Sequence, residues 1–381
     1  MPDRISFSRH ELLAALNLIG KVRPWQREYR EPGKPNQLGL ALIKISTWSG
    51  VATLTSANLD ITISVDVPCG PGDTTMYLPL PNLLAATQKA AEGAEIVLEA
   101  GDGVTVFRAG RFRSQMAGST RDMAPVRPPL DGARHTIPAD TMRGGLRAAA
   151  PAVLDDSKRP FMGGVLLRGD GQSLSFVGMD DNRIHSAVGN NGGIDTNVIM
   201  PEALADLLAA ILPEGKDVQV TIDQRAIELV FDRIRVGSNL IQGQFPAYRE
   251  RLHTGKTRVY RAPASKLLND IELVALVAPD KTRDIRFDFG PQCEVSAFRR
   301  SGNGVDVGCV VLEGAYEGPP LAIGFQVRLV TDALTLFGHE PIEWRMDGPL
   351  DPTVVTCPTL PGIEAMISPL RLVADHLRVA A

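Results

Sequence analysis

The sequence predicts an α+β protein built from three copies of one domain, each with an antiparallel sheet and two helices. Three observations support this fold class. The 381 residues are enough for two or three domains of roughly 150 residues each. Two series of amphipathic helices recur along the chain with one common period. Between the helices lie strand-like runs joined by turn-forming residues.

One series of helices follows an apolar, strand-like lead and a proline or polar start signal. The apolar stripes of these helices lie in Leu83–Ala86, Leu204–Leu208 and Val330–Leu334. The leads before them are Leu78, Ile199 and Ile323, at intervals of 121 and 124 residues. Such nearly equal intervals over the whole chain are typical of a repeated domain.

A second series of helices precedes the first, with apolar residues three or four positions apart. Its stripes are Leu12, Leu16 and Ile19; Met142, Leu146 and Val153; and Leu267 or Leu268, Ile271 and Val274. The strand-like leads before them are Phe7, His135 and Arg258, at intervals of 128 and 123 residues. Two helix series with one common period indicate three copies of a domain.

Each copy also contains a predicted hairpin with a tight turn. The turns are Asp102-Gly103, Asp170-Gly171 and Gly302-Asn303-Gly304. Turn-rich stretches at 127–132 and 253–256 separate the copies. We therefore predict domains at residues 1–130, 131–255 and 256–381, the last with a short C-terminal extension.

The composition is that of an ordinary globular protein, with 44% hydrophobic and 22% charged residues. The 40 basic and 44 acidic residues give a net charge of −4, so any contact with nucleic acid is expected on only part of the surface. No apolar run reaches the ~20 residues of a membrane span, and the charged start Met1–Arg4 is unlike a signal peptide. We expect a cytoplasmic protein.

No motif for catalysis or for a cofactor is evident. The four cysteines lie far apart without a CxxC pair, which argues against a disulfide framework and a zinc site. Asp180–Arg183 with His185 lacks the spacing of a calcium loop, so a solvated or binding turn is favoured. Neither a nucleotide-binding glycine motif nor the order of a catalytic triad is present. We expect no catalytic residue, cofactor or metal.

One segment carries a specific resemblance. Within LIQGQFPAYRERL at 240–252, Gly243–Arg249 resembles the G-x-F-P-x-Y-R segment of bacterial DNA polymerase III beta subunits, the sliding clamps. The supporting matches are Phe161–Leu167, Met179–Ile184, Val198–Pro201, Gly324–Val327 and Ser368–Leu372. The chain departs from that family at Lys34–Leu40, at Asp181 and Asn182, and at Glu250. It therefore resembles a divergent member.

The resemblance implies a head-to-tail homodimer of three-domain protomers, closed into a ring around duplex DNA. Such a clamp is a non-catalytic processivity factor that binds DNA without sequence specificity. Its implied partners are the DNA polymerase III alpha subunit, the clamp loader and other proteins with clamp-binding motifs. Two alternatives stay open, an accessory or regulatory clamp relative of a mobile element or repair pathway, and an enzyme with an unrecognised site.

The resemblance also implies a groove for short apolar peptides. It maps to Met162, Met179, Arg183, Ile184, Pro246, Pro369, Leu370, Arg371 and Leu372. Flexible apolar side chains suit a site that accepts several peptides. Without the resemblance, Met162, Met179 and Ile184 are more simply interpreted as core residues. The tail Val373–Ala381 extends past the leucine at which typical clamps end, and we expect it beside the groove.

A ring that slides needs scattered cations in its lumen rather than a tight grip on DNA. The candidates lie on or near the helices of the second series and in the loop after the first helix: Arg9, Lys21, Arg23, Arg27, Arg30, Lys34, Arg143, Arg147 and Lys266. Each of them taken singly is more simply interpreted as part of the solvated face of a helix, whereas the set as a whole favours a lumen. Contact between protomers is predicted to pair an edge of domain one with an edge of domain three, with Leu276 and Val277 as candidates.

Overall fold

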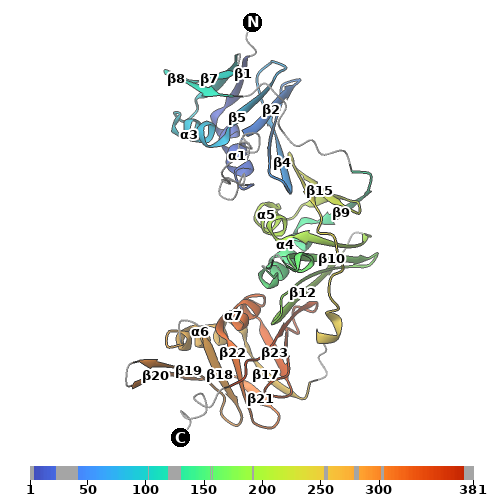
Figure 1. Cartoon of the computed structure of the whole chain (residues 1–381), viewed down its shortest axis with the longest axis vertical. Coiled ribbons are helices and arrows are strands. Elements are labelled where there is room, and N and C mark those ends of the chain that lie inside the picture. Colours follow the sequence, from blue (N-terminus) through green and yellow to red (C-terminus); the bar gives the residue numbers. More distant parts are fainter. Residues whose placement is uncertain are drawn as a thin grey trace. The chain divides into compact units, whose positions relative to one another are not determined.

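One order of elements occurs three times in the chain: a strand, a helix, four strands, a second helix and three strands (Figure 1). The third copy contains one additional short strand. The computed structural model describes residues 4–22, 42–101, 103–118, 130–154, 156, 158–190, 193–252, 256–278, 283–301 and 304–372. Within these residues the repeat and the α+β class predicted from the sequence are confirmed.

The elements of the three copies are as follows. The first contains β1 (Arg4–Ser8), α1 (Arg9–Ile19), β2 (Leu42–Trp48), β3 (Val51–Ala57), β4 (Ile61–Pro68), β5 (Thr75–Pro79), α3 (Leu80–Lys89), β6 (Glu95–Ala100), β7 (Val104–Ala109) and β8 (Phe112–Ala117). The second contains β9 (Ala133–Pro138), α4 (Ala139–Ala149), β10 (Gly164–Asp170), β11 (Ser173–Met179), β12 (Arg183–Asn190), β13 (Asp195–Pro201), α5 (Glu202–Ile211), β14 (Asp217–Ile222), β15 (Ala226–Phe231) and β16 (Ile234–Asn239).

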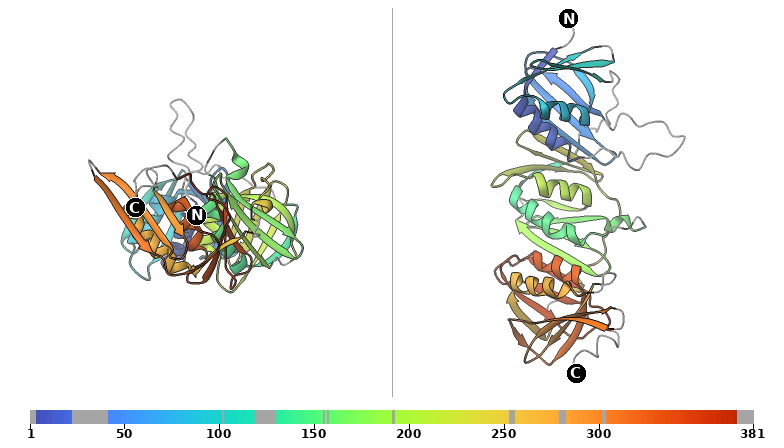
Figure 2. Two further views of the ribbon diagram at one scale, coloured as in Figure 1. Left: turned by 90° about the horizontal axis from the view of Figure 1, so that it is seen from below. Right: turned by 90° about the vertical axis from the view of Figure 1, so that its left-hand side faces the viewer.

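The third copy contains β17 (Arg258–Pro263), α6 (Ala264–Ala275), β18 (Asp284–Phe289), β19 (Glu294–Ser301), β20 (Gly304–Val311), β21 (Ala315–Glu317), β22 (Leu321–Gln326), α7 (Val327–Thr335), β23 (Pro341–Met346), β24 (Thr353–Thr356) and β25 (Ile363–Ile367). Three single-turn 3₁₀ helices, η1 (Ala150–Ala152), η2 (Pro160–Met162) and η3 (Arg249–Leu252), lie between these elements. α6 and α7 pack side by side (Figure 2).

The strands form four antiparallel sheets. Two have four strands each, in the orders β1-β6-β7-β8 and β20-β19-β18-β22. The eight-stranded sheet has the order β5-β2-β3-β4-β16-β15-β14-β9, and the nine-stranded sheet has the order β13-β10-β11-β12-β25-β24-β23-β17-β21. Each large sheet therefore combines strands from two successive copies.

The chain divides into two compact units, one of Met1–Asp140 with Ala210–Leu240 and one of Thr141–Ala209 with Ile241–Ala381. This division follows the two large sheets rather than the sequence repeat. The domain boundaries predicted near residues 130 and 255 therefore stay a prediction. Among the residues described, no helix is long and apolar enough to cross a membrane.

The apolar positions predicted for α1, α4 and α6 are buried, but one of them lies outside its helix. Leu12, Leu16 and Ile19 of α1 are fully buried, as are the predicted core residues of α6. Val153 was assigned to the stripe of α4, which is wrong because α4 ends at Ala149 and gives way to η1. The reason is Pro151, whose ring has no N–H to donate and clashes with the carbonyl four residues earlier in a helix.

The core of the third copy is aromatic. Phe287 packs against Phe325 and Trp344, with ring centroids 6.0 Å and 5.1 Å away. Trp344 is fully buried, and its Nε1 donates a hydrogen bond of 2.9 Å to the hydroxyl of Thr353. This core reaches one face of the nine-stranded sheet, where it includes residues of β23, β24 and β25.

Candidate functional site

The opposite face of the nine-stranded sheet carries a second, separate cluster. We call it the methionine cluster, and its members are Met162, Leu166, Val177, Met179, Ile184, Ile199, Tyr248, Leu252, Val354 and Met366. Strand register brings these residues together. Met179 pairs with Ile184, and Ile184 pairs with Met366, across adjacent strands. Residues paired in this way share a face of the sheet.

Three residues predicted for the peptide groove belong to the methionine cluster. The exposed fractions of Met162, Met179 and Ile184 are 5%, 2% and 0%. This burial is also what a core role requires, so the assignment of the three side chains to a groove stays a prediction. The half-buried apolar residues Leu154 and Phe161 pack against the cluster and extend its apolar surface outward.

A strap, residues Ile241–Leu252, covers one part of this face. It begins at the edge of the sheet, where the Ile241 N–H donates 2.9 Å to the Ile199 carbonyl. Gly243 follows with a φ of 144°, and a Cβ placed there would lie 3.0 Å from the Cβ of Phe161. Only glycine meets both requirements without strain. Farther along the strap, Phe245 and Tyr248 pack edge to face at 6.3 Å.

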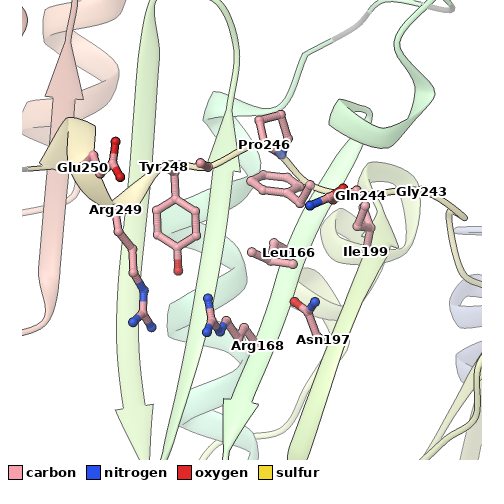
Figure 3. Close-up of a pocket in the computed structure, with 12 residues that line it drawn as sticks. Leu166, Arg168, Asn197, Ile199, Gly243, Gln244, Pro246, Tyr248, Arg249 and Glu250 are labelled. Carbon is pink, nitrogen blue, oxygen red and sulfur yellow. The ribbon is translucent and has the colours of Figure 1, made fainter.

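The strap and the sheet enclose a pocket of about 500 Å³ (Figure 3). Its lining consists of Leu166, Arg168, Asn197, Ile199 and the strap residues Gly243–Glu250. Pro246 is the residue of the predicted groove that lines this pocket. Leu166, Ile199 and Tyr248 belong both to the pocket wall and to the methionine cluster.

Arg183 is the first residue of β12, and its side chain reaches α7. Its exposed fraction is 3%, and its guanidinium forms ion pairs with Asp180 at 3.0 Å and with Asp332 of α7. The other carboxylate oxygen of Asp180 accepts the backbone N–H groups of Asn182 and Arg183. Two carboxylates therefore compensate a buried cation that would be costly alone.

His185 is two residues farther along β12 and is fully buried. Its Nδ1 lies 3.2 Å from the Ala148 carbonyl oxygen, while its Nε2 has no hydrogen-bond partner among the described residues. Burial, followed by the nearby Arg183 charge, lowers the pKa of His185 to about 4. The imidazole is therefore neutral near pH 7 and donates through Nδ1. Within the part of the chain described, no group of three or more His, Cys, Asp or Glu residues is placed to hold a metal.

The closing segment Ser368–Leu372 runs to the edge of β22 instead of into the methionine cluster. The Ser368 N–H donates 2.7 Å to the Asn182 carbonyl, and the Leu370 N–H donates 2.7 Å to the Gly324 carbonyl. Leu372 covers Gly324 so closely that a Cβ there would lie 2.6 Å from it. Arg371 is exposed, whereas Pro369 and the two leucines are half-buried. The tail from Val373 lies outside the described residues.

Sequence reasoning missed an ion-pair cluster beside Met162 and Met179. Arg159 contacts both carboxylate oxygens of Asp181 at 2.5 Å and 2.8 Å, and its Nε donates to Asp156 at 3.1 Å. The hydrogen bond from Arg159 holds the pKa of Asp181 below its usual value. Asp181 was noted as part of a solvated or binding turn and as a departure from the clamp pattern, and no local motif connects it with an arginine 22 positions away.

The predicted DNA-facing residues differ in their contacts. Arg9 donates to the carbonyls of Thr87 and Gln88 at the end of α3, and Arg147 donates to the Ala209 carbonyl near the end of α5. Helix C-termini favour such cations. Lys266 is exposed and paired with Glu313. Lys21 is exposed and Arg143 is half-buried. Arg23, Arg27, Arg30 and Lys34 lie outside the described residues, and all nine assignments stay predictions.

The two four-stranded sheets end in strands that pair on one side only, β8 and β20. Apolar side chains are exposed on or beside both edges: Phe112 on β8, Val305, Val307 and Val311 on β20, and Leu273 on α6. Of the predicted interface residues, Leu276 is 76% exposed at the end of α6. Val277 is half-buried and packs against Gly308 of β20. These surfaces are the structural features available for contact between protomers.

Comparison with known proteins extends the resemblance to the whole chain. Residues 136–247 match the family model of the DNA polymerase III beta subunit, central domain. The beta sliding clamp of Synechococcus elongatus is 22% identical over 96% of this chain and 98% of its own length, and that of Caulobacter vibrioides is 24% identical over 87% and 92%.

The same likeness appears in three dimensions. The DnaN sliding clamp of Pseudomonas aeruginosa, 19% identical in sequence, superposes with a TM-score of 0.89 and covers 98% of this chain and 100% of its own. At that identity the superposition shows the clamp fold. Together with the family model over residues 136–247 and the sequence relatives, it supports a divergent member of the DNA polymerase III beta subunit family.

Proposed function

We propose that this protein is a DNA sliding clamp, a non-catalytic processivity factor that encircles duplex DNA and tethers a replicative polymerase and other partners. The observation that carries this conclusion is the threefold repeat of one element order along the chain, in a fold that clamp structures share over 98% of its length. Likeness over nearly the full length of replication clamps favours this role over an accessory clamp and over an enzyme.

The proposed ring is a head-to-tail homodimer in which β8 of one protomer pairs with β20 of its partner. Unpaired strand edges with exposed valines are aggregation hazards unless another chain covers them. Leu273 and Leu276 of α6 extend the apolar surface beside β20. A head-to-tail dimer has two such contacts, so the β8 edge and the β20 edge of each protomer are both covered.

Binding to DNA is proposed to rely on diffuse attraction. Arg9, Arg143 and Arg147 on α1 and α4, with Lys21 after α1, provide cations on corresponding elements of two copies. Lys266 contributes less because Glu313 already pairs with it. Attraction without specific contacts allows sliding, and it makes binding to short linear DNA weak and sensitive to salt.

Partner docking is proposed at a groove that combines the surface above the methionine cluster with Pro246 and Pro369–Leu372. The support for this is the apolar surface around Met162 and the half-buried leucines beside β22. Methionines adapt to different apolar peptides, which suits a protein with several partners. The replicative polymerase and the clamp loader are the proposed ligands.

The architecture can be tested without any partner. Light scattering after gel filtration is expected to give twice the chain mass of 41.0 kDa, and negative-stain images are expected to show a ring with an opening wide enough for duplex DNA. A monomer at micromolar concentration, or a dimer without an opening, would contradict the proposal.

A further inference from the structure

We propose that the pocket beneath the strap is an acid-selective subsite for partner peptides. In this inference, which rests on the proposed clamp function, Arg168 and Arg249 bind an acidic side chain of the peptide. A neighbouring apolar side chain packs on the opposite end of the pocket, against Leu166 and Ile199.

Strand register gives the pocket one apolar end and one polar end. Leu166 of β10 lies opposite Ile199 of β13, and two residues farther along Arg168 lies opposite Asn197. Because side chains alternate between faces along a strand, both pairs project from the same face. Tyr248 and Phe245 of the strap lie over this face and complete the lining. A ligand in the pocket therefore contacts apolar side chains at one end and Arg168 at the other end, two residues farther along β10.

The two arginines are available for a ligand. Both side chains are exposed, and neither takes part in an ion pair among the residues that the structure describes. In Figure 3 both guanidinium groups extend to the same side as the Tyr248 hydroxyl, whereas the Glu250 carboxylate points away from them. By contrast, Arg159 and Arg183, in the same unit, each bind two carboxylates of the protein itself.

The chemistry of the lining selects the class of partner. Guanidinium groups bind carboxylates through paired, charge-assisted hydrogen bonds. Nucleic acid backbones instead need a row of cations. Here two cations border an apolar floor of Leu166, Ile199 and Phe245, which suits a peptide with acidic and apolar side chains. Asn197 and Gln244 add amide groups that can bond to a peptide backbone.

The pocket is continuous with the surface proposed to bind partner peptides. Leu166, Ile199 and Tyr248 form its wall and also belong to the methionine cluster, which contains Met162 and Met179. Pro246 lines the pocket and was assigned independently to the groove. A peptide that docks above the cluster therefore needs only a short extension to place an acidic residue beside Arg168.

The strap holds Arg249 in a fixed position. Gly243 passes closely over Phe161, Ile241 is bonded to β13, and Tyr248 is 94% buried, with an exposed fraction of 6%. Arg249 follows at once as the first residue of η3. Arg168 is held equally well, because it lies within a paired strand. The backbone that carries the two cations is therefore in place before a peptide binds, which reduces the backbone entropy lost on binding.

The test is a double-mutant cycle on the full chain. The probes are fluorescein-labelled synthetic peptides that share an apolar Leu-Leu-Phe block and differ in two flanking residues, which are both Asp, both Asn or both Lys. Binding is followed by fluorescence polarisation. The variants are Arg168→Gln, Arg249→Gln, the double variant, and Arg225→Gln, a matched control at an exposed arginine between β14 and β15.

The double variant is expected to bind the Asp peptide about three- to tenfold more weakly, as is typical of two partly exposed charge contacts. Binding of the Asn peptide is expected to stay unchanged in every variant, and Arg225→Gln is expected to bind all peptides as the unmodified chain does. Replacing both pocket arginines by glutamate is expected to reverse the preference, so that the Lys peptide binds more tightly than the Asp peptide.

Equal weakening of the Asp and Asn peptides, or no loss for the Asp peptide, would overturn the inference. So would an unmodified chain that does not bind the Asp peptide. A titration with single-stranded oligo(dT) tests nucleic acid as the alternative ligand. If the arginine variants lost only oligonucleotide binding, the two arginines would be assigned to nucleic acid and the inference would be overturned. Light scattering and images of the ring report the proposed clamp function separately from these peptide measurements.

Discussion

Arg183 and Asp332 form a partly buried ion pair between residues 149 positions apart, joining the start of β12 to α7. The arginine is almost fully buried, and its second partner Asp180 lies in its own turn. The pair therefore connects the turn that was predicted to border the peptide groove with a helix of the third copy. Its removal offers a direct test of how that turn is held.

We expect Asp332→Ala to lower the free energy of unfolding by about 2–3 kcal/mol, because it leaves a buried cation with one carboxylate fewer. Urea denaturation measures the change. The matched control is Arg328→Ala, which removes only a 77%-exposed partner of the same aspartate and is expected to cost less than about 0.5 kcal/mol. Equal effects of the two substitutions would show that burial of the Arg183–Asp332 pair contributes nothing to the free energy of unfolding.

Because His185 is buried, we expect the free energy of unfolding to decrease in mild acid. Burial lowers its pKa from 6.5 to about 4, so between these values the unfolded state binds a proton that the folded state does not. The stabilising effect of the neutral imidazole is complete above pH 6.5 and is lost progressively toward pH 4, by up to about 3 kcal/mol. Across this range the free energy of unfolding is expected to depend less on pH in His185→Gln than in the unmodified protein.

The control for that measurement is His339→Gln, at an exposed histidine. The same slope between pH 6.5 and pH 4 in His185→Gln and in the unmodified protein would refute the account of His185.

A charge on the free edge of β20 is expected to separate the protomers. Val307 is 48% exposed there, and Val307→Lys would place a desolvated ammonium group in the proposed contact. Gel filtration with light scattering is expected to show a monomer at concentrations where the unmodified protein is a dimer. Val51→Lys, at a 43%-exposed valine of β3, is the control and is expected to stay dimeric. A dimeric Val307→Lys protein would remove β20 from the interface.

Truncation of the closing leucines is expected to weaken peptide binding without opening the ring. Leu370 and Leu372 are half-buried beside β22, and changing both to alanine removes apolar contacts worth up to about 3 kcal/mol. The Leu370 backbone bond to Gly324 is retained in alanine. Titration of a polymerase-derived peptide measures the loss. Unchanged affinity would exclude both leucines from the groove.

Patterns local in sequence predicted the repeat well. Spacing of three or four placed Leu12, Leu16 and Ile19 on the buried side of α1, and recurring helices revealed the three copies. The stripe drawn through Val153 was wrong because the effect of Pro151 on the helix outweighed apolar spacing. Helix patterns predict which face is buried more reliably than where a helix ends.

The site was harder to predict because its contacts cross between distant segments. Asp332 shows no sign in the sequence that it faces Arg183, and Asp181 carries no mark of its pairing with Arg159. Arg168 lies two residues before the predicted turn Asp170-Gly171, and nothing in that segment connects it with the pocket in which its register opposite Asn197 places it. Such juxtapositions depend on how strands pair across the sheet, which no single segment determines.

The measurement that tests the central claim most directly is the lifetime of the loaded protein on DNA of two topologies. The protein is loaded by the clamp loader of its own organism onto a nicked circular plasmid, and half of the sample is then cut once. A ring that encircles duplex DNA is expected to remain on the circle many times longer than on the linear form, and to resist salt that abolishes binding to short duplexes. Equal dissociation from circular and linear DNA would contradict the sliding clamp.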